Sequence, residues 1–208
     1  MAEKKLVKVC GMTDGNNIRD VESLGADFIG FIFYPKSPRR VKTLPSYLPS
    51  SAKRVGVFVN VPAEEILVQD IRYHFDYIQL HGNESPEFCR EVRNYGLKVI
   101  KAFSIADRSD IARVKDYSEV CDYFVFDTKT ALVGGSGNTF DWSILEDYRE
   151  NVPFLLSGGL SLQNIGQIKE FSHERLAGYD LNSRFEIEPG IKDISRLKLF
   201  IETINEQN

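Results

Sequence analysis

The chain has 208 residues, with 26 Lys and Arg against 30 Asp and Glu, and a formal net charge of −4. This balance argues against a protein that coats nucleic acid, and 42% hydrophobic with 27% charged residues excludes a disordered or fibrous chain. Because domains usually hold about 100–200 residues, we expect a single domain over residues 1–208.

Targeting and cysteine patterns add further exclusions. No run approaches the roughly 20 apolar residues of a membrane span, so we expect no membrane partner. Met1–Lys5 leads into only two apolar residues before the next charge, which is not the apolar core of a secretory signal. Cys10, Cys89 and Cys121 form no CxxC pair and fit neither a disulfide framework nor a zinc site. We expect a cytoplasmic protein.

Eight apolar, β-branched or aromatic runs recur about every 20–27 residues and predict β-strands. In chain order they are Leu6–Cys10, Phe28–Phe33, Arg54–Val59, Tyr77–Leu80, Lys98–Phe103, Tyr123–Phe126, Phe154–Leu156 and Leu176–Leu181.

Segments with helical spacing lie between these strands, among them Asn17–Leu24, Pro62–Arg72 and Ile194–Ile204. Residues suited to cap the first turn of the intervening helices are Thr13 or Asp14, Asp107, Asp141, Ser161 and Asp193. Ser37–Ser51 contains three prolines, so it has room only for a short helix.

Alternating strands and helices leave two architectures, an open doubly wound sheet and a closed (β/α)₈ barrel. Phe28–Phe33 is apolar throughout, as expected of a parallel strand buried on both faces. A dinucleotide-binding open sheet would carry Gly-x-Gly-x-x-Gly after its first strand, whereas Cys10-Gly11-Met12-Thr13 stands there. We therefore predict a (β/α)₈ TIM barrel, whose chemistry sits at the carboxyl ends of the strands.

The strand ends offer one pair suited to proton transfer. Cys10 ends the first strand and Asp127 ends the sixth, so a thiol and a carboxylate could act as base and acid. Each also has an ordinary structural interpretation. Cys10 could be a small buried apolar residue, and Asp127 a surface turn residue.

Glycines and small polar residues follow the seventh and eighth strands. Gly158 and Gly159 permit close backbone approach and exposed N–H groups, and Asn182 and Ser183 follow the last strand. A barrel often holds phosphate between these two loops. The alternative is a left-handed turn that merely leads into a helix.

Three other strand-end residues are candidates for substrate contact. Arg39 could fork onto a ligand carboxylate or belong to a solvated basic loop. His81 is either a structural imidazole or a wall of the site. Asp180 would be costly to bury unpaired, so it should face the barrel mouth or a donor. The glycine-rich stretch Thr130–Asn138 is long enough to cover a ligand there.

Motifs along nearly the whole chain resemble one family, the phosphoribosylanthranilate isomerases of tryptophan biosynthesis. The motifs are Val7–Thr13, Gly25–Asp27, Gly30–Phe33, Ser37–Arg39, Val55–Asn60, Gln79–Gly82, Phe126–Lys129, Gly134–Gly137, Phe140–Trp142, Leu156–Leu160 and Glu188–Asp193.

This resemblance implies a (β/α)₈ barrel that catalyses the Amadori rearrangement of N-(5-phosphoribosyl)anthranilate, a phosphorylated aminosugar, without metal or cofactor. By position, Cys10 matches the family's general base and Asp127 its general acid. Arg39 matches the residue that faces the anthranilate carboxylate.

The remaining site residues also transfer by position. Gly159 and the Asn182-Ser183 turn match phosphate-binding loops, with Gly158 beside them, and His81 and Asp180 match positions that line the site. We expect a monomer or a homodimer.

One departure from the family pattern follows the last strand. Two serines and a glycine usually stand there, whereas this chain has Asn182-Ser183-Arg184. An arginine in place of glycine would strain a backbone with positive φ, or it would add a cation directed at phosphate. Two rival readings remain: a related sugar-phosphate isomerase barrel, such as that of histidine biosynthesis, and a catalytically silent barrel that binds a phosphorylated ligand.

Overall fold

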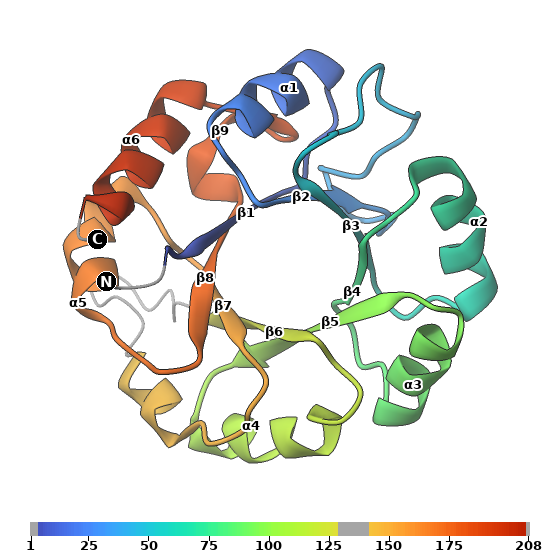
Figure 1. The fold of residues 1–208 in the computed structure, drawn as a ribbon, viewed down its shortest axis with the longest axis vertical. Helices are drawn as coiled ribbons and strands as arrows, with labels where there is room; N and C mark the ends of the chain where they lie inside the picture. The colour runs from blue at the N-terminus through green and yellow to red at the C-terminus, as the bar shows by residue number, and fades with distance from the viewer. Residues whose placement is uncertain (1–3, 129–141, 207–208) are drawn as a thin grey trace.

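The computed structural model describes residues 4–128 and 142–206. Eight parallel strands close into a barrel in the order β1 to β8, as predicted, and helices surround the ring (Figure 1). The strands are β1 Leu6–Cys10, β2 Phe28–Ile32, β3 Lys53–Phe58, β4 Tyr77–Leu80, β5 Lys98–Ile105, β6 Tyr123–Thr128, β7 Phe154–Ser157 and β8 Leu176–Leu181.

The helices lie outside the ring (Figure 1). They are α1 Gly15–Ser23, α2 Ala63–Tyr73, α3 Pro86–Asn94, α4 Arg108–Ala112, α5 Ile165–Glu170 and α6 Ile194–Asn205, with 3₁₀ turns η1 Val114–Tyr117, η2 Trp142–Asp147, η3 Leu162–Asn164 and η4 Ser183–Phe185. A short antiparallel pair, β9 Glu186–Glu188 and β10 Ile191–Lys192, follows η4.

Local sequence signals explain where several helices begin. The side chains of Asp14, Asp107 and Asp193 accept backbone N–H groups in the first turns of α1, α4 and α6, so these predicted caps are confirmed. Ser161 precedes η3 and shares a capping interaction with Asn164. The last predicted cap, Asp141, lies outside the described residues.

Ser37–Ser51, which has room only for a short helix, contains none, and the segment forms turns and bends. Its end is fixed to α1 instead. One carboxylate oxygen of Glu22 accepts the N–H groups of Ser50, Ser51 and Ala52 at 2.8, 2.6 and 2.9 Å. The Glu22 side chain of α1 thus accepts backbone N–H groups that a helix would have paired with its own carbonyls. Prolines make a helix unfavourable in this segment, because they lack an N–H donor.

The barrel is held at its amino-terminal edge by a repeated contact. Asp27, Asp76 and Asp122 each precede an even-numbered strand and accept an N–H from the strand before it, at 2.8, 2.9 and 2.8 Å. The next residue in each case is aromatic: Phe28, Tyr77 or Tyr123.

These three aromatic rings meet inside the barrel, where their centroids lie 5.5, 5.8 and 5.9 Å apart in edge-to-face contacts. We call Phe28, Tyr77 and Tyr123 the aromatic plug. The interior beyond it is filled by apolar side chains, including Val55, Ile100, Val125 and Leu155. A larger core packs between the strands and the helices.

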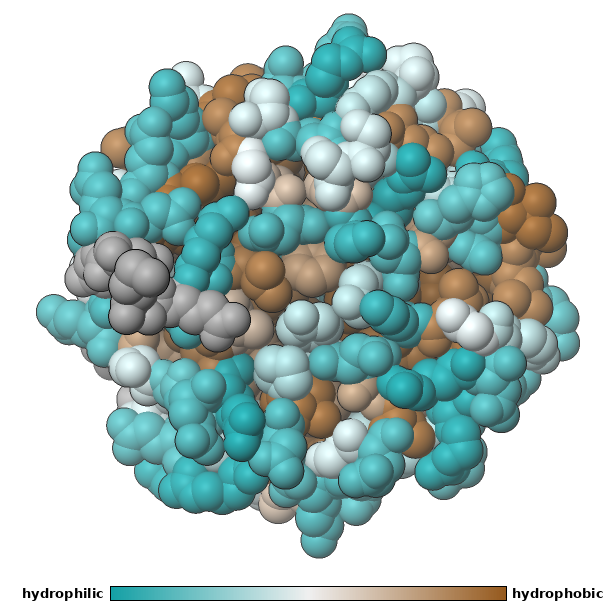
Figure 2. Space-filling model, in the orientation of Figure 1, coloured by the Kyte–Doolittle hydropathy of each residue, from teal (hydrophilic) through white to brown (hydrophobic). Residues whose placement is uncertain are grey.

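The surface is mostly polar on the face seen in Figure 2, with apolar areas divided by polar side chains. Val68 and Ile71 of α2 are among the exposed apolar residues. Within residues 4–128 and 142–206, none of the helices has the length and apolar character needed to cross a bilayer.

Candidate active site

A cavity of about 240 Å³ opens at the carboxyl ends of the strands. It brings together eight of the nine residues singled out in the sequence: Cys10, His81, Asp127, Gly158, Gly159, Asp180, Asn182 and Ser183. Their positions along the chain span β1 to η4, so only closure of the barrel makes them neighbours. Arg39 is not among the described residues that line this cavity.

Cys10 ends β1 and is 4% exposed. It belongs to the apolar cluster inside the barrel, together with Val57 and Ala102. Burial raises the pKa of the Cys10 thiol, and the ammonium of Lys8 acts in the opposite direction by its charge and a hydrogen bond. The apolar interpretation of Cys10 therefore describes one side of the residue, while its other side borders the cavity.

Asp180 does not point freely into the barrel mouth. Its carboxylate lies 2.9 Å from the ammonium of Lys8, and both side chains are almost fully buried. The two residues are register partners where β8 pairs with β1. The expected donor for Asp180 is thus a lysine in the first strand, and it satisfies the carboxylate inside the protein.

Asp127 faces His81 across the cavity. The Oδ2 atom of Asp127 lies 3.7 Å from Nε2 of His81, and each side chain is 35% exposed. The other ring nitrogen, Nδ1, lies 2.8 Å from Nε2 of Gln79, which is fully buried. The Gln79 side chain thus fixes the orientation of the His81 ring from the side opposite Asp127.

The loops after β7 and β8 form one wall of the cavity. Gly158 and Gly159 have φ values of +85° and +67°, a conformation that side-chain-bearing residues rarely adopt. Two consecutive left-handed residues turn the backbone at the cavity, as required for close approach of a ligand to main-chain N–H groups.

Arg184 shares this wall and occupies η4. Its backbone is not in the left-handed region, where Asn60 and His74 are the only described residues other than glycine. The strain considered for an arginine at this position is therefore absent. Its exposed side chain has no hydrogen bond or ion pair to the part of the chain that the structure describes.

Arg39 does not line the cavity among the described residues, and its side chain is held by Glu186. Its Nε is 2.9 Å from both carboxylate oxygens of Glu186, and its Nη2 is 2.6 Å from one of them. Gly11 packs against both Arg39 and Asn182, because a Cβ at this glycine would come within 2.9 Å of Arg39 Cδ and 3.0 Å of Asn182 Oδ1. Arg39 is thus neither a solvated loop residue nor unpaired, since one edge of its guanidinium is already occupied.

Glu186 links this arginine, through Lys192, to the loop after β8. The ammonium of Lys192 lies 2.7 Å from Glu186 and 2.8 Å from the side-chain oxygen of Asn182. Burial raises the pKa of Glu186, but hydrogen bonds from Arg39 and Lys192 outweigh it and leave the pKa below its usual value. Burial lowers the pKa of Lys192, although Glu186 opposes this.

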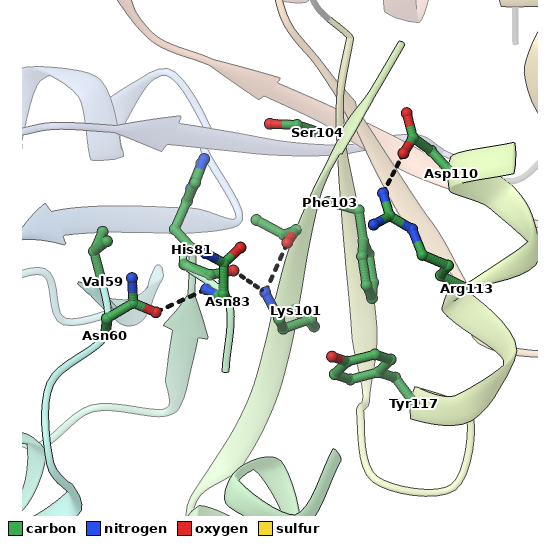
Figure 3. Close-up of a pocket in the computed structure, with 12 residues that line it drawn as sticks. Val59, Asn60, His81, Asn83, Lys101, Phe103, Ser104, Asp110, Arg113 and Tyr117 are labelled. Atoms are coloured by element: carbon green, nitrogen blue, oxygen red, sulfur yellow. Dashed lines mark hydrogen bonds and ion pairs between the residues drawn. The ribbon is translucent and has the colours of Figure 1, made fainter. Parts of the chain in front are cut away.

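A second cavity of about 520 Å³ lies beside the first, and His81 lines both (Figure 3). Lys101 stands at its centre, between Asn60 and Asn83 on one side and the rings of Phe103 and Tyr117 on the other. The ammonium of Lys101 donates to three backbone carbonyls at 2.8–3.2 Å and pairs with Glu84 at 3.3 Å. Its charge is therefore already satisfied.

Four residues that shape the site escaped the sequence reasoning: Lys8, Gln79, Glu186 and Lys192. A signal existed for Lys8, because it shares the inward face of β1 with Cys10 two residues later. No local signal reveals Glu186 or Lys192, since their partners lie in distant segments. The Thr130–Asn138 stretch lies outside the described residues.

The fold and the site together define a (β/α)₈-barrel enzyme whose thiol and carboxylate border a cavity with a glycine turn. The family model described as N-(5'-phosphoribosyl)anthranilate (PRA) isomerase matches residues 7–203. The chain is similar to the N-(5'-phosphoribosyl)anthranilate isomerase of Phocaeicola vulgatus, with 48% identity over 97% of this chain and 98% of the relative.

Two solved structures share the fold. A phosphoribosylanthranilate isomerase in complex with reduced 1-(o-carboxyphenylamino)-1-deoxyribulose 5-phosphate is 32% identical, with a TM-score of 0.80 over 97% of this chain and 99% of that one. Monomers of the dimeric enzyme from Thermotoga maritima are 30% identical, with a TM-score of 0.77 and coverage of 97% and 98%. The chain belongs to the phosphoribosylanthranilate isomerase family, whose members are isomerases of tryptophan biosynthesis.

Proposed function

We propose that this chain converts N-(5-phosphoribosyl)anthranilate into 1-(2-carboxyphenylamino)-1-deoxyribulose 5-phosphate, with Asp127 as general acid and Cys10 as general base. The observation that carries the proposal is that both side chains line one cavity at the carboxyl ends of the strands, beside the Gly158-Gly159 turn. The relative crystallised with a reduced form of this product supports the choice of ligand.

The reaction begins with opening of the sugar ring. Asp127 donates a proton to the ring oxygen while the anilino nitrogen forms a protonated Schiff base with C1. An acid in this role must carry a proton in the bound complex, so substrate must exclude water from a carboxyl that is 35% exposed in the free cavity. His81, whose ring is held by Gln79, faces the carboxylate that remains.

Cys10 acts in the second step. The positive nitrogen acidifies C2, and the thiolate takes the C2 proton to give an enolamine. Tautomerisation then adds a proton at C1 and removes one from O2, so substrate and product are isomers. Because the pKa of Cys10 is raised by burial, its thiolate form is scarce in the free site at neutral pH.

Binding of the remote groups positions the reacting atoms. We assign the phosphate to the main-chain N–H groups around Gly158, Gly159, Asn182 and Ser183. Arg39 is assigned to the anthranilate carboxylate, through the guanidinium edge that Glu186 leaves unoccupied. Such contacts spend binding energy on orientation, which accelerates a reaction of bound groups.

A coupled fluorescence assay tests the activity. Anthranilate and phosphoribosyl pyrophosphate, with a purified transferase, generate the substrate, whose fluorescence decay is followed with and without this protein. Product mass and retention must be checked, because spontaneous hydrolysis also consumes substrate. We expect saturable conversion to the carboxyphenylamino-deoxyribulose phosphate. Folded protein that gives no such product would refute the proposed reaction.

Substitution of the acid and the base tests the mechanism. Cys10→Ser and Asp127→Asn should each reduce turnover by at least about 100-fold, the low end for a positioned acid or base. Cys89→Ala and Asp116→Asn serve as controls, since neither residue lines the cavity among its described residues. Near-full turnover in Cys10→Ser or Asp127→Asn would remove that residue from its role.

A further inference from the structure

Lys8 is a charged residue in the barrel interior that the proposed mechanism does not use. Its side chain is fully buried, and its ammonium lies 2.9 Å from the carboxylate of Asp180. Burying such a pair carries a large desolvation cost, and apolar residues of similar volume often stabilise a protein equally well. Stability alone is therefore a weak explanation for a lysine at this position.

The position of Lys8 links it to Cys10. The two residues are two apart on β1 and share its inward face. Asp180 is the register partner of Lys8 on β8, so the carboxylate holds the ammonium at the closing seam of the barrel. Cys10 and Asp180 border the cavity, whereas Lys8 is not among the described residues that line it. Lys8 thus lies beneath the thiol, away from substrate.

We propose that Lys8 is a positioning residue for the base: its ammonium, fixed by Asp180, is the counter-charge that stabilises the Cys10 thiolate. The inference rests on the proposed role of Cys10. When the thiol loses its proton to solvent, a negative charge appears in an apolar interior. A cation beneath it offsets the cost of that charge, and the thiolate can then accept the C2 proton.

The test must distinguish the effect of Lys8 on the Cys10 thiolate from the effects of other charges near Cys10. Lys192 of β10 favours the thiolate, and its ammonium is already paired with Glu186. The carboxylate of Asp180 disfavours the thiolate. Asp127 and His81 face the same cavity from the ends of β6 and β4. Lys8 is the nearest contributor on the strand of Cys10 itself, and it acts by charge and hydrogen bond together.

The experiment measures the protonation of Cys10 directly, without substrate. Folded protein is treated with iodoacetamide across a pH series, and alkylation of the Cys10 peptide is followed by mass spectrometry, which separates it from Cys89 and Cys121. The pH at which the alkylation rate is half-maximal gives the apparent pKa of the Cys10 thiol. Lys8→Met should move this midpoint up by about one unit or more, a tenfold loss of thiolate at a fixed lower pH.

Asp180→Asn gives the opposite prediction. It removes a negative charge and leaves the lysine, so the midpoint should move to lower pH. Lys101→Met is the matched control, because Lys101 is also a buried, ion-paired lysine but is not among the main charges that act on Cys10. Its midpoint should stay at the wild-type value. A loss of packing alone would not move the first two variants in opposite directions.

Kinetics supply the second readout. Lys8→Met should lower kcat at neutral pH by about tenfold, in step with its thiolate fraction, with recovery as the pH rises past the new midpoint. Its KM should change little because Lys8 lies beneath the cavity wall. Should Lys8→Met fail to fold, Lys8→Gln, which removes the charge but keeps a donor for Asp180, supplies the midpoint instead.

Three outcomes overturn the inference. These are an unmoved midpoint in folded Lys8→Met, an unmoved or raised midpoint in Asp180→Asn, and an equal shift in Lys101→Met. Failure of the mechanism itself has a different signature. Full turnover in Cys10→Ser would reject Cys10 as the base whatever the titrations give.

Discussion

The guanidinium of Arg39 illustrates what residue-level reasoning could and could not predict. An arginine after the second strand indicated a carboxylate partner, and the structure supplies one within the chain, Glu186. The two are 147 positions apart, and no local pattern joins them. The chemical type of a residue at a strand end can thus be read from the sequence. The partner of its side chain cannot, because distant segments such as those of Arg39 and Glu186 meet only in the folded barrel.

Loss of Arg39 should impair recognition of the substrate carboxylate. Arg39→Ala is expected to raise KM about 10–100-fold, the cost of a bidentate charged contact, and Glu186→Gln to raise it less, because the arginine keeps its charge but loses its anchor. Comparison with a substrate made from aniline in place of anthranilate provides the control. Equal KM effects on both substrates would show that Arg39 does not read the carboxylate.

Arg184 makes a separate residue-scale prediction. Arg184 lines the cavity next to Asn182 and Ser183, the turn assigned to phosphate, and its backbone is not in the left-handed region. Arg184→Gly should raise both the substrate KM and the inhibition constant of inorganic phosphate about 3–10-fold, with kcat nearly unchanged, since an exposed charge contributes modestly. Arg184→Lys should retain most of the affinity. An unchanged phosphate inhibition constant in Arg184→Gly would exclude the contact.

At the scale of elements, the eight strands were predicted to within a few residues because buried parallel strands are short apolar runs between polar turns. Helices α1, α2 and α6 followed from their spacing. The segment after β2 was not predictable in this way, because its conformation depends on Glu22 of α1 rather than on its own residues. Long-range capping leaves no periodic trace in the sequence.

The Glu22 contact makes that segment sensitive to acid. Partial burial acts to raise the pKa of Glu22, but hydrogen bonds from the Tyr47 hydroxyl and the N–H groups of Ala52 and Ser51 lower it to about 2. A folded-state pKa below the unfolded value stabilises the fold above about pH 4.5, and this contribution is lost as the pH falls toward 2.

Glu22→Gln should therefore lower the free energy of unfolding by about 1–2 kcal/mol at pH 7, a modest value because the carboxylate is partly solvated. The difference from wild type should shrink below pH 4.5. Urea denaturation at pH 7 and pH 4 measures it, with Asp20→Asn on the exposed side of α1 as the matched control. A difference that grows on acidification would contradict the assignment.

For the whole molecule, stability depends on filling the barrel axis. Phe28 is 4% exposed and contacts both tyrosines of the aromatic plug. Phe28→Ala should lower the free energy of unfolding by about 3–5 kcal/mol, through lost burial and the cavity left behind. Ile71→Ala, at a residue 74% exposed, should stay within about 0.5 kcal/mol. Guanidinium denaturation measures the free energy of unfolding of both variants. A small decrease in Phe28→Ala would mean that neighbouring side chains fill the space left by the ring.

The chain's assembly state, a monomer or a homodimer, stays a prediction that sedimentation would test. Val68 and Ile71 lie three residues apart on α2, and both side chains are exposed. The overall architecture was predictable because strand and helix alternate through the sequence, and closure of β8 onto β1 then follows from the number of strands.

The aromatic plug also constrains how molecules travel. With the barrel axis filled at one end, the reaction chamber is a blind passage, and ketose must leave through the opening by which aminoaldose arrives. Occupancy by either compound excludes the other, so accumulated product competes with incoming substrate. Flux through this enzyme is therefore tied to how quickly the next step removes its product.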